Sequence, residues 1–171
     1  MSKILLVSPP FYRLMGSHYN GIQLGLGYIA SILRDNGYEV RIYNADYYNS
    51  EFYLNQRELF QRYTDYKMIL DNLAHPIWAE IEDTVREYGP DIVGISMYTG
   101  AYKSAKNVAK ITKKVDRGIK VVVGGPHPTL APEDTTFCED FDLVVRGDGE
   151  YTFLEIAEGT SPEKILGLSY R

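Results

Sequence analysis

Short apolar runs rich in β-branched residues alternate along this chain with longer segments of helical periodicity. The runs that we expect to form strands are 4–7, 39–43, 91–96, 120–123 and 141–145. Helical spacing is expected over 22–36, 101–115, 132–138 and 150–158. Strands joined through helices pair in parallel, and strands without polar alternation are covered on both faces. The pattern therefore predicts an α/β fold with a five-stranded parallel sheet between two helical layers.

The expected sheet is flavodoxin-like, or Rossmann-like, because five strands of this kind commonly take the order 2-1-3-4-5. Periodicity alone does not determine that order. Residues 46–90 separate the second and third expected strands, and a plain crossover needs far fewer. Segments 57–63, 68–73 and 78–88 have helical spacing, and Pro76 suits the first turn of the last one. We expect an enlarged helical crossover packed on the sheet; a lid or a docking surface is the alternative.

Composition excludes several classes of protein. The net charge of −5 argues against a nucleic-acid binder, which needs a basic face. Cys138 is the single cysteine, so the chain can form neither an internal disulfide nor its own iron–sulfur cluster. No apolar stretch approaches the ~20 residues that span a bilayer. We expect a cytoplasmic protein without a membrane span.

Ligands of open α/β sheets bind beyond the carboxyl ends of the strands. The candidate binding residues in the loops at that edge are Ser8, Pro9, Pro10, Gly25, Ser96, Met97, Tyr98, Gly124, Gly125, His127, Gly147 and Glu150. The pair Gly124-Gly125 removes two Cβ atoms, so that a flat or bulky group can approach the backbone. A tight turn is the alternative for the glycines, and capping of the next helix is the alternative for Ser96.

No nucleotide or metal motif accompanies these loops. Gly25-Leu26-Gly27 does not continue as GxGxxG, and no P-loop is present. Ser8-Pro9-Pro10 stands where response regulators carry acidic residues, which disfavours phosphoryl transfer. His18, His75 and His127 lack metal-ligand spacing, so we expect solvated or capping roles, with His127 the best placed for ligand contact. We predict no catalytic and no metal-ligating residue in this chain.

Five ordered motifs resemble the N-terminal cobalamin-binding domain of cobalamin-dependent radical S-adenosylmethionine enzymes. They are Ser8-Pro9-Pro10, the segments 24–30 and 90–96, Val122-Val123-Gly124-Gly125-Pro126-His127-Pro128-Thr129, and Val145-Arg146-Gly147-Asp148-Gly149-Glu150. The resemblance covers about 1–160. The remaining 161–171 looks like the start of a linker to a radical S-adenosylmethionine domain that this chain lacks. Its strand-like end has no partner that we can identify from the sequence.

The resemblance implies cobalamin as the cofactor. Ser96 and Gly124-Gly125 match the serine motif and glycine pair of corrinoid carriers, whereas Ser8 to Tyr12 lacks their axial histidine. It therefore implies a base-off form without a histidine ligand, with the nucleotide tail beside Gly124-Gly125 and its phosphate at a helix N-terminus.

The resemblance also implies the setting in which the cofactor would act. The full-length enzyme would add a [4Fe-4S] cluster and S-adenosylmethionine and perform methyl transfer or ring formation at an unactivated carbon. The partner of this chain would be its own C-terminal domain, and the chain alone is expected not to be catalytic.

Two other functions remain open at this stage. A stand-alone corrinoid carrier is disfavoured by the missing axial histidine and the strand-like tail. A flavodoxin-like binding module that has lost cobalamin would keep the fold and the glycine-rich loops without the cofactor.

Overall fold

The computed structural model describes residues 2–136 and 138–170. Phe137, in the expected helix 132–138, and Arg171, at the end of the expected linker 161–171, lie outside the described residues. The strands are β1 (Lys3–Ser8), β2 (Glu39–Asn44), β3 (Ile92–Ser96), β4 (Lys120–Gly124), β5 (Leu143–Val145) and β6 (Leu168–Tyr170). The α-helices are α1 (Leu24–Asp35), α2 (Gln56–Gln61), α3 (Tyr63–Asp71), α4 (Pro76–Tyr88), α5 (Tyr102–Val115), α6 (Pro126–Leu130), α7 (Pro132–Thr136) and α8 (Glu150–Ala157). Short 3-10 turns are η1 (Arg13–Met15), η2 (Thr99–Ala101) and η3 (Pro162–Lys164).

The sheet has the order β2-β1-β3-β4-β5-β6, which confirms the expected order of the first five strands. These five strands are parallel, whereas β6 pairs antiparallel with β5. The expectation of five strands and of a tail without a partner is therefore wrong. Leu168 lies opposite Val145 and Tyr170 opposite Leu143, so the tail extends the sheet by a sixth strand.

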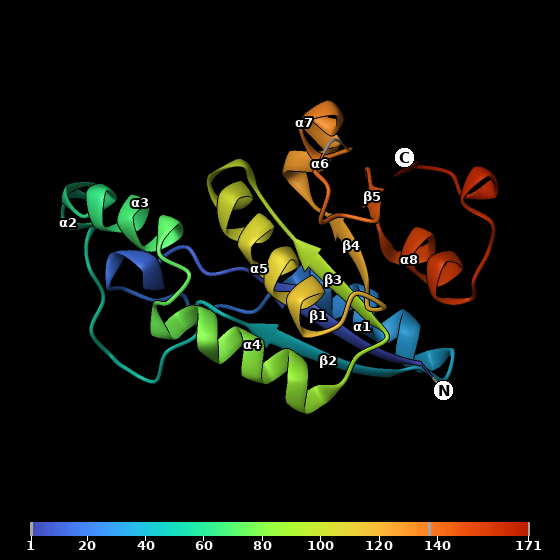
Figure 1. The fold of residues 1–171 in the computed structure, drawn as a ribbon, viewed down its shortest axis with the longest axis horizontal. Helices are drawn as coiled ribbons and strands as arrows, with labels where there is room; N and C mark the ends of the chain where they lie inside the picture. Colours follow the sequence, from blue (N-terminus) through green and yellow to red (C-terminus); the bar gives the residue numbers. More distant parts are fainter. Residues whose placement is uncertain (1, 137, 171) are drawn as a thin grey trace.

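Helices cover both faces of the sheet, as the apolar strands require. Figure 1 shows α4 and α5 in front of the sheet and α1 behind it. On β1 the side chains of Leu5 and Val7 pack toward α4 and α5, and those of Ile4 and Leu6 pack toward α1 and α8. This alternation follows from the period of two along a strand, and it gives each face its own apolar core.

The enlarged crossover is helical, as expected, and its α4 packs on the sheet beside α5, whereas α3 packs against η1 and α5. Tyr66 of α3 is buried, and its hydroxyl donates a hydrogen bond to the carbonyl of Gly100 at 2.6 Å. The indole of Trp78 donates to the carbonyl of Ile69 at 3.0 Å and thereby joins α4 to α3. Figure 1 shows α2 and α3 together beyond the end of the sheet.

Local signals in the sequence explain where several helices begin. Pro76 occupies the first turn of α4, and the Nδ1 atom of His75 accepts a hydrogen bond from the amide of Ile77. Of the solvated and capping roles that remained open for this histidine, the structure shows the capping one. Pro126 likewise begins α6, a short helix that the sequence reading treated as a loop. Within the described ranges, no helix is long and apolar enough to cross a bilayer.

Candidate functional site

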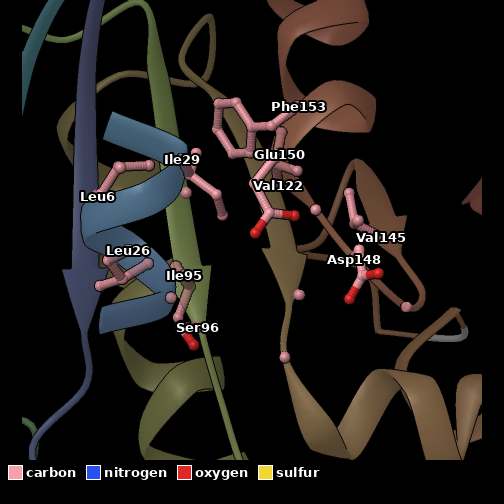
Figure 2. Close-up of a pocket in the computed structure, with 16 residues that line it drawn as sticks. Leu6, Leu26, Ile29, Ile95, Ser96, Val122, Val145, Asp148, Glu150 and Phe153 are labelled. Carbon is pink, nitrogen blue, oxygen red and sulfur yellow. The ribbon is translucent and has the colours of Figure 1, made fainter. Parts of the chain in front are cut away.

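A cavity of about 190 Å³ opens at the carboxyl edge of the sheet, on the face covered by α1 and α8 (Figure 2). Strands β1, β3, β4 and β5 form its back, α1 forms one side, and the loop into α8 forms the other. Its depth is apolar, since Leu6, Val122 and Phe153 line it. Ser96, Asp148 and Glu150 bring polar groups to the same space.

Two glycines on neighbouring strands, Gly94 and Gly124, shape this cavity. Gly94 pairs with Val122 and Ser96 pairs with Gly124, so Gly94 and Gly124 lie on the same face of β3 and β4. A Cβ atom at Gly94 would lie 2.7 Å from the Phe153 ring and 2.8 Å from Leu6, closer than side chains tolerate. The ring of Phe153 therefore lies directly over the backbone of β3.

Gly124 and Gly125 have different roles, so both interpretations of the glycine pair apply. A Cβ atom at Gly124 would make an ordinary contact of 3.5 Å with Val145 and would face the cavity. Gly125 has a φ of +105°, and its Cβ would lie 2.8 Å from the carbonyl oxygen of Met97. Gly124 thus leaves space for a ligand, whereas Gly125 is required by the turn.

Hydrogen bonds of Thr129 on α6 connect the turn after β4 to the loop after β5. The hydroxyl of Thr129 donates to the carbonyl of Gly125 and accepts from the amide of Gly147, both at 2.9 Å. Gly147 has a φ of +76°, a conformation that glycine adopts without strain. Ser96 does not cap the next helix, because neither η2 nor α5 has a side-chain cap.

The structure brings half of the predicted binding residues together. Those that line the cavity are Gly25, Ser96, Gly124, Gly125, Gly147 and Glu150. Ser8 ends β1, and Pro9 and Pro10 follow it; none of the three lines the cavity. Met97 is buried in the core on the opposite face of the sheet. Tyr98 is 42% exposed and contacts Phe11 rather than the cavity.

The loop after β1 is held by buried polar groups. The Asp46 carboxylate accepts hydrogen bonds from the amides of Phe11 at 2.7 Å and Arg13 at 3.0 Å. Burial raises the pKa of Asp46 above its ordinary value, although these amides and the Arg13 charge oppose the shift. The hydroxyl of Ser104 on α5 donates to the carbonyl of Pro10 at 2.6 Å. The backbone of this loop is therefore fixed from two sides.

Arg13 joins the same loop to α4. Its guanidinium donates to both carboxylate oxygens of Glu80, at 2.9 and 2.7 Å, and the Tyr43 hydroxyl donates to Glu80 at 2.6 Å. The hydrogen bond from Arg13 is the main reason that the pKa of Glu80 is lowered. Burial, followed by the Glu80 hydrogen bond, raises the pKa of Tyr43.

His18 and His127 are buried, contrary to the solvated or capping role expected for them. The Nε2 atoms of both rings lack a hydrogen-bond partner in the part of the chain that the structure describes. His18 packs on Tyr53 with ring centroids 4.0 Å apart, and His127 packs on Tyr102 at 4.8 Å. Neither ring lines the cavity, and the ligand contact expected of His127 stays a prediction.

Several cavity residues escaped sequence reasoning. Gly94 carried a usable signal, because an isolated glycine inside a strand often marks a close approach of another group. Phe153 and Ile29 lie on helices, and their helical spacing is typical of core residues in general. Asp148 lies in the motif Val145-Arg146-Gly147-Asp148-Gly149-Glu150, from which the sequence predicts only Gly147 and Glu150 as binding residues. Among residues 2–136 and 138–170, no cluster of side chains suits a metal ion.

The mostly parallel sheet and the cavity at its carboxyl edge define a Rossmann-like cofactor-binding domain. Comparison with known families makes this class specific. The family described as "B12 binding domain" matches residues 16–157, and the chain belongs to that family.

Curated relatives agree with this assignment. The chain is 36% identical, over 99% of its length, to an uncharacterized methyltransferase of Pyrococcus horikoshii, of which it covers 32%. It is 30% identical, over 86% of its length, to the cytidylyl-2-hydroxyethylphosphonate methyltransferase of Streptomyces wedmorensis, of which it covers 27%. The chain thus spans about a third or less of the length of these relatives.

Solved structures share the fold. The radical S-adenosylmethionine methyltransferase TsrM of Kitasatospora setae matches 99% of the chain with a TM-score of 0.65 and 19% identity, over 28% of its own length. The cobalamin-dependent S-adenosylmethionine radical enzyme OxsB, with aqua-cobalamin and S-adenosylmethionine bound, matches 99% of the chain with a TM-score of 0.70 and 18% identity, over 21% of its length. The resemblance to the cobalamin-binding domain of such enzymes is confirmed.

Proposed function

We propose that this chain binds cobalamin with the nucleotide tail of the cofactor in the cavity described above. The observation that carries the proposal is the cavity itself, with the space that Gly124 leaves beside Val145 on the face of the sheet covered by α1 and α8. At about 190 Å³ the cavity is smaller than the roughly 300–1,000 Å³ of sites for whole drug-sized ligands. It suits one part of a large cofactor, and its apolar depth suits the flat dimethylbenzimidazole base.

The phosphate of the tail fits best near the start of α1. Gly25 lines the cavity there, and the first turn of α1 contains no acidic residue. The first turn of α8 carries Glu150, which would repel a phosphate. Free amides at a helix N-terminus and the helix dipole favour an anion.

We expect the base-off form without a histidine ligand. The segment from Ser8 to Tyr12, directly after β1, contains no histidine. Its backbone is fixed by the hydrogen bond that the amide of Phe11 donates to Asp46 and by the one that Ser104 donates to the carbonyl of Pro10. His18 and His127 are buried away from the cavity, so neither ring reaches a ligand there without rearrangement. Electron paramagnetic resonance of bound cob(II)alamin checks this, because a coordinated nitrogen splits the cobalt lines. Nitrogen splitting that disappears in His18→Ala or His127→Ala would contradict it.

Bound cobalamin would supply a cobalt centre able to carry a methyl group, while the protein binds and orients it. In the full-length protein we propose methyl transfer or ring formation at an unactivated carbon, with a [4Fe-4S] cluster and S-adenosylmethionine held by a further domain. Residues 161–171 would begin the linker to it. The relatives named as methyltransferases support methyl transfer. Ring formation is supported by the anaerobic magnesium-protoporphyrin IX monomethyl ester cyclase of Rubrivivax gelatinosus, to which the chain is 38% identical over 90 residues.

The test is retention of hydroxocobalamin by the 171-residue chain, measured by equilibrium dialysis and the visible spectrum. Gly124→Val places methyl groups in the cavity and should abolish retention, because the tail can no longer enter. Lys120→Val is the matched control, since it lies on the same strand at an exposed position outside the cavity. Unchanged retention by folded Gly124→Val would contradict the proposed seat of the tail. Failure of the wild type to retain the cofactor would favour a flavodoxin-like module that has lost cobalamin.

A further inference from the structure

We infer that Glu150 recognises the nucleotide tail by accepting a hydrogen bond from a ribose hydroxyl, and that it thereby selects cobalamin over corrinoids without that tail. This inference rests on the proposed function and concerns the same cavity. It assigns a specificity-determining role to the first residue of α8.

The side chain of Glu150 enters the cavity. Figure 2 shows its carboxylate directed into the space between α1 and β5, whereas Asp148 lies beside the loop after β5. Glu150 is half-buried and Asp148 is exposed. The side chains of Ile29 and Phe153 that share this space offer Glu150 no donor.

The Glu150 carboxylate lacks a protein partner. Among residues 2–136 and 138–170, no hydrogen bond or ion pair involves this side chain. In the same residues, six ion pairs join other carboxylates to lysine or arginine side chains. An ionised carboxylate only accepts hydrogen bonds, and covering it without a donor is costly. A ligand that fills the cavity must therefore present a donor at this position.

The ribose is the part of the tail that meets this requirement. The dimethylbenzimidazole is attached through one nitrogen, and its other nitrogen is an acceptor when neutral. The phosphodiester has no proton to donate and is repelled by the carboxylate. The ribose carries free hydroxyls next to the base, and carboxylates recognise such hydroxyls in dinucleotide-binding folds. The corrin amides also donate, but a cavity of about 190 Å³ does not admit the macrocycle.

The charge of Glu150 also determines where the phosphate lies. A negative side chain at the N-terminus of α8 cancels the attraction of that helix for anions, whereas α1 begins without an acidic residue. The base, the ribose and the phosphate would then follow the cavity from its apolar depth past Glu150 to the start of α1.

Binding of two corrinoids tests the inference. Hydroxocobalamin and diaquacobinamide share the corrin and its amides, but cobinamide lacks the phosphate, the ribose with its hydroxyls and the dimethylbenzimidazole. We expect Glu150→Ala to weaken hydroxocobalamin binding about ten-fold or more, because a charge-assisted hydrogen bond is lost. Binding of diaquacobinamide should not change. Glu155→Ala is the matched control, since Glu155 is on α8 outside the cavity.

Each other outcome overturns the inference. Equal weakening of both corrinoids would mean that Glu150 contacts the corrin or only supports α8. Unchanged or tighter hydroxocobalamin binding would mean that the carboxylate meets no donor or faces the phosphate. Circular dichroism of Glu150→Ala separates these results from loss of fold, and Glu150→Gln repeats the comparison with a side chain of the same size. If the wild-type chain does not bind hydroxocobalamin at all, the result refutes the proposed function itself.

Discussion

At the scale of single residues, the cavity depends on strand positions where a side chain is missing. Gly94 lies under the Phe153 ring, and an added methyl group would come within 2.8 Å of both Phe153 and Leu6. The opposite situation occurs on α1, where a Cβ atom at Gly27 would have no neighbour within 4 Å. These two glycines allow the same substitution to be tested in a crowded and an open environment.

We predict that Gly94→Ala destabilises the chain by about 1–3 kcal/mol, the usual effect of overpacking a core. Gly27→Ala should stabilise it by about 0.5–1 kcal/mol, because alanine loses less conformational entropy in a helix. Urea unfolding of both variants measures the difference. If Gly94→Ala leaves the free energy of unfolding unchanged, Phe153 moves aside at no cost. The apolar depth of the cavity, which Phe153 lines, would then not be fixed by Gly94.

Asp46 is the buried carboxylate whose titration should be visible in stability. Its pKa is raised above the ordinary value of 3.8, mainly because burial disfavours the charged form. In the pH window just above 3.8 the folded state then holds more protons than the unfolded state. The contribution of this group to stability should therefore fall as the pH rises through that window.

Asp46→Asn isolates the effect, since asparagine keeps an acceptor for the amides of Phe11 and Arg13 but does not titrate. We predict that the free energy of unfolding of the wild type, relative to the variant, decreases as the pH rises from about 4 toward neutrality. Urea unfolding at several pH values checks the slope. A rising difference would show that the amide hydrogen bonds outweigh burial and that the pKa of Asp46 is lowered.

At the scale of elements, sequence reasoning was reliable where an element carries its own signal. The strands β1, β3 and β4 are runs of β-branched residues, and α4 has both a proline start and an apolar face. The strand-like end of the chain forms β6, but its three residues carry no signal that identifies β5 as the partner. The helix α6 begins in a glycine- and proline-rich segment that reads equally well as a loop.

The sixth strand should contribute to stability through its buried side chain. Leu168 is 8% exposed and packs in the core beside α8, whereas Leu166, two residues earlier, is 87% exposed. We predict that Leu168→Ala costs about 2–5 kcal/mol and that Leu166→Ala changes stability by less than about 0.5 kcal/mol. Thermal unfolding of the two variants provides the measurement. Equal effects would mean that β6 is not held on the sheet in solution.

At the scale of the whole molecule, the sequence predicted the edge of the sheet at which the cavity lies but not the shape of that cavity. The glycine-rich loops pointed to that edge, and Gly25, Ser96 and Gly124 do meet there. The apolar depth depends on which face each strand residue occupies and on how Phe153 approaches Gly94. Those facts follow from register and helix packing, which a single sequence does not specify.

Ligand binding should stabilise both faces together. Trp78 is the single tryptophan and is 1% exposed on the face opposite the cavity, so its fluorescence reports unfolding far from the ligand. At hydroxocobalamin concentrations about 100 times the Kd, we predict a rise of about 2.7 kcal/mol in the free energy of unfolding reported by Trp78. Gly124→Val should show no rise. A ligand-dependent shift in circular dichroism but not in Trp78 fluorescence would indicate that the two faces unfold separately.

The position of the enlarged crossover has a consequence for how this fold diversifies. Helices α2 and α3 pack with η1 and α5 on one side of the sheet, whereas the cavity opens on the other. Lengthening such a connection costs little entropy, since the cost of closing a loop grows only slowly with its length. Changes in the length of the exposed stretches between β2 and α4 would therefore leave the cavity with Gly94, Gly124 and Glu150 undisturbed, provided that buried residues such as Tyr66 keep their place in the core of the other face.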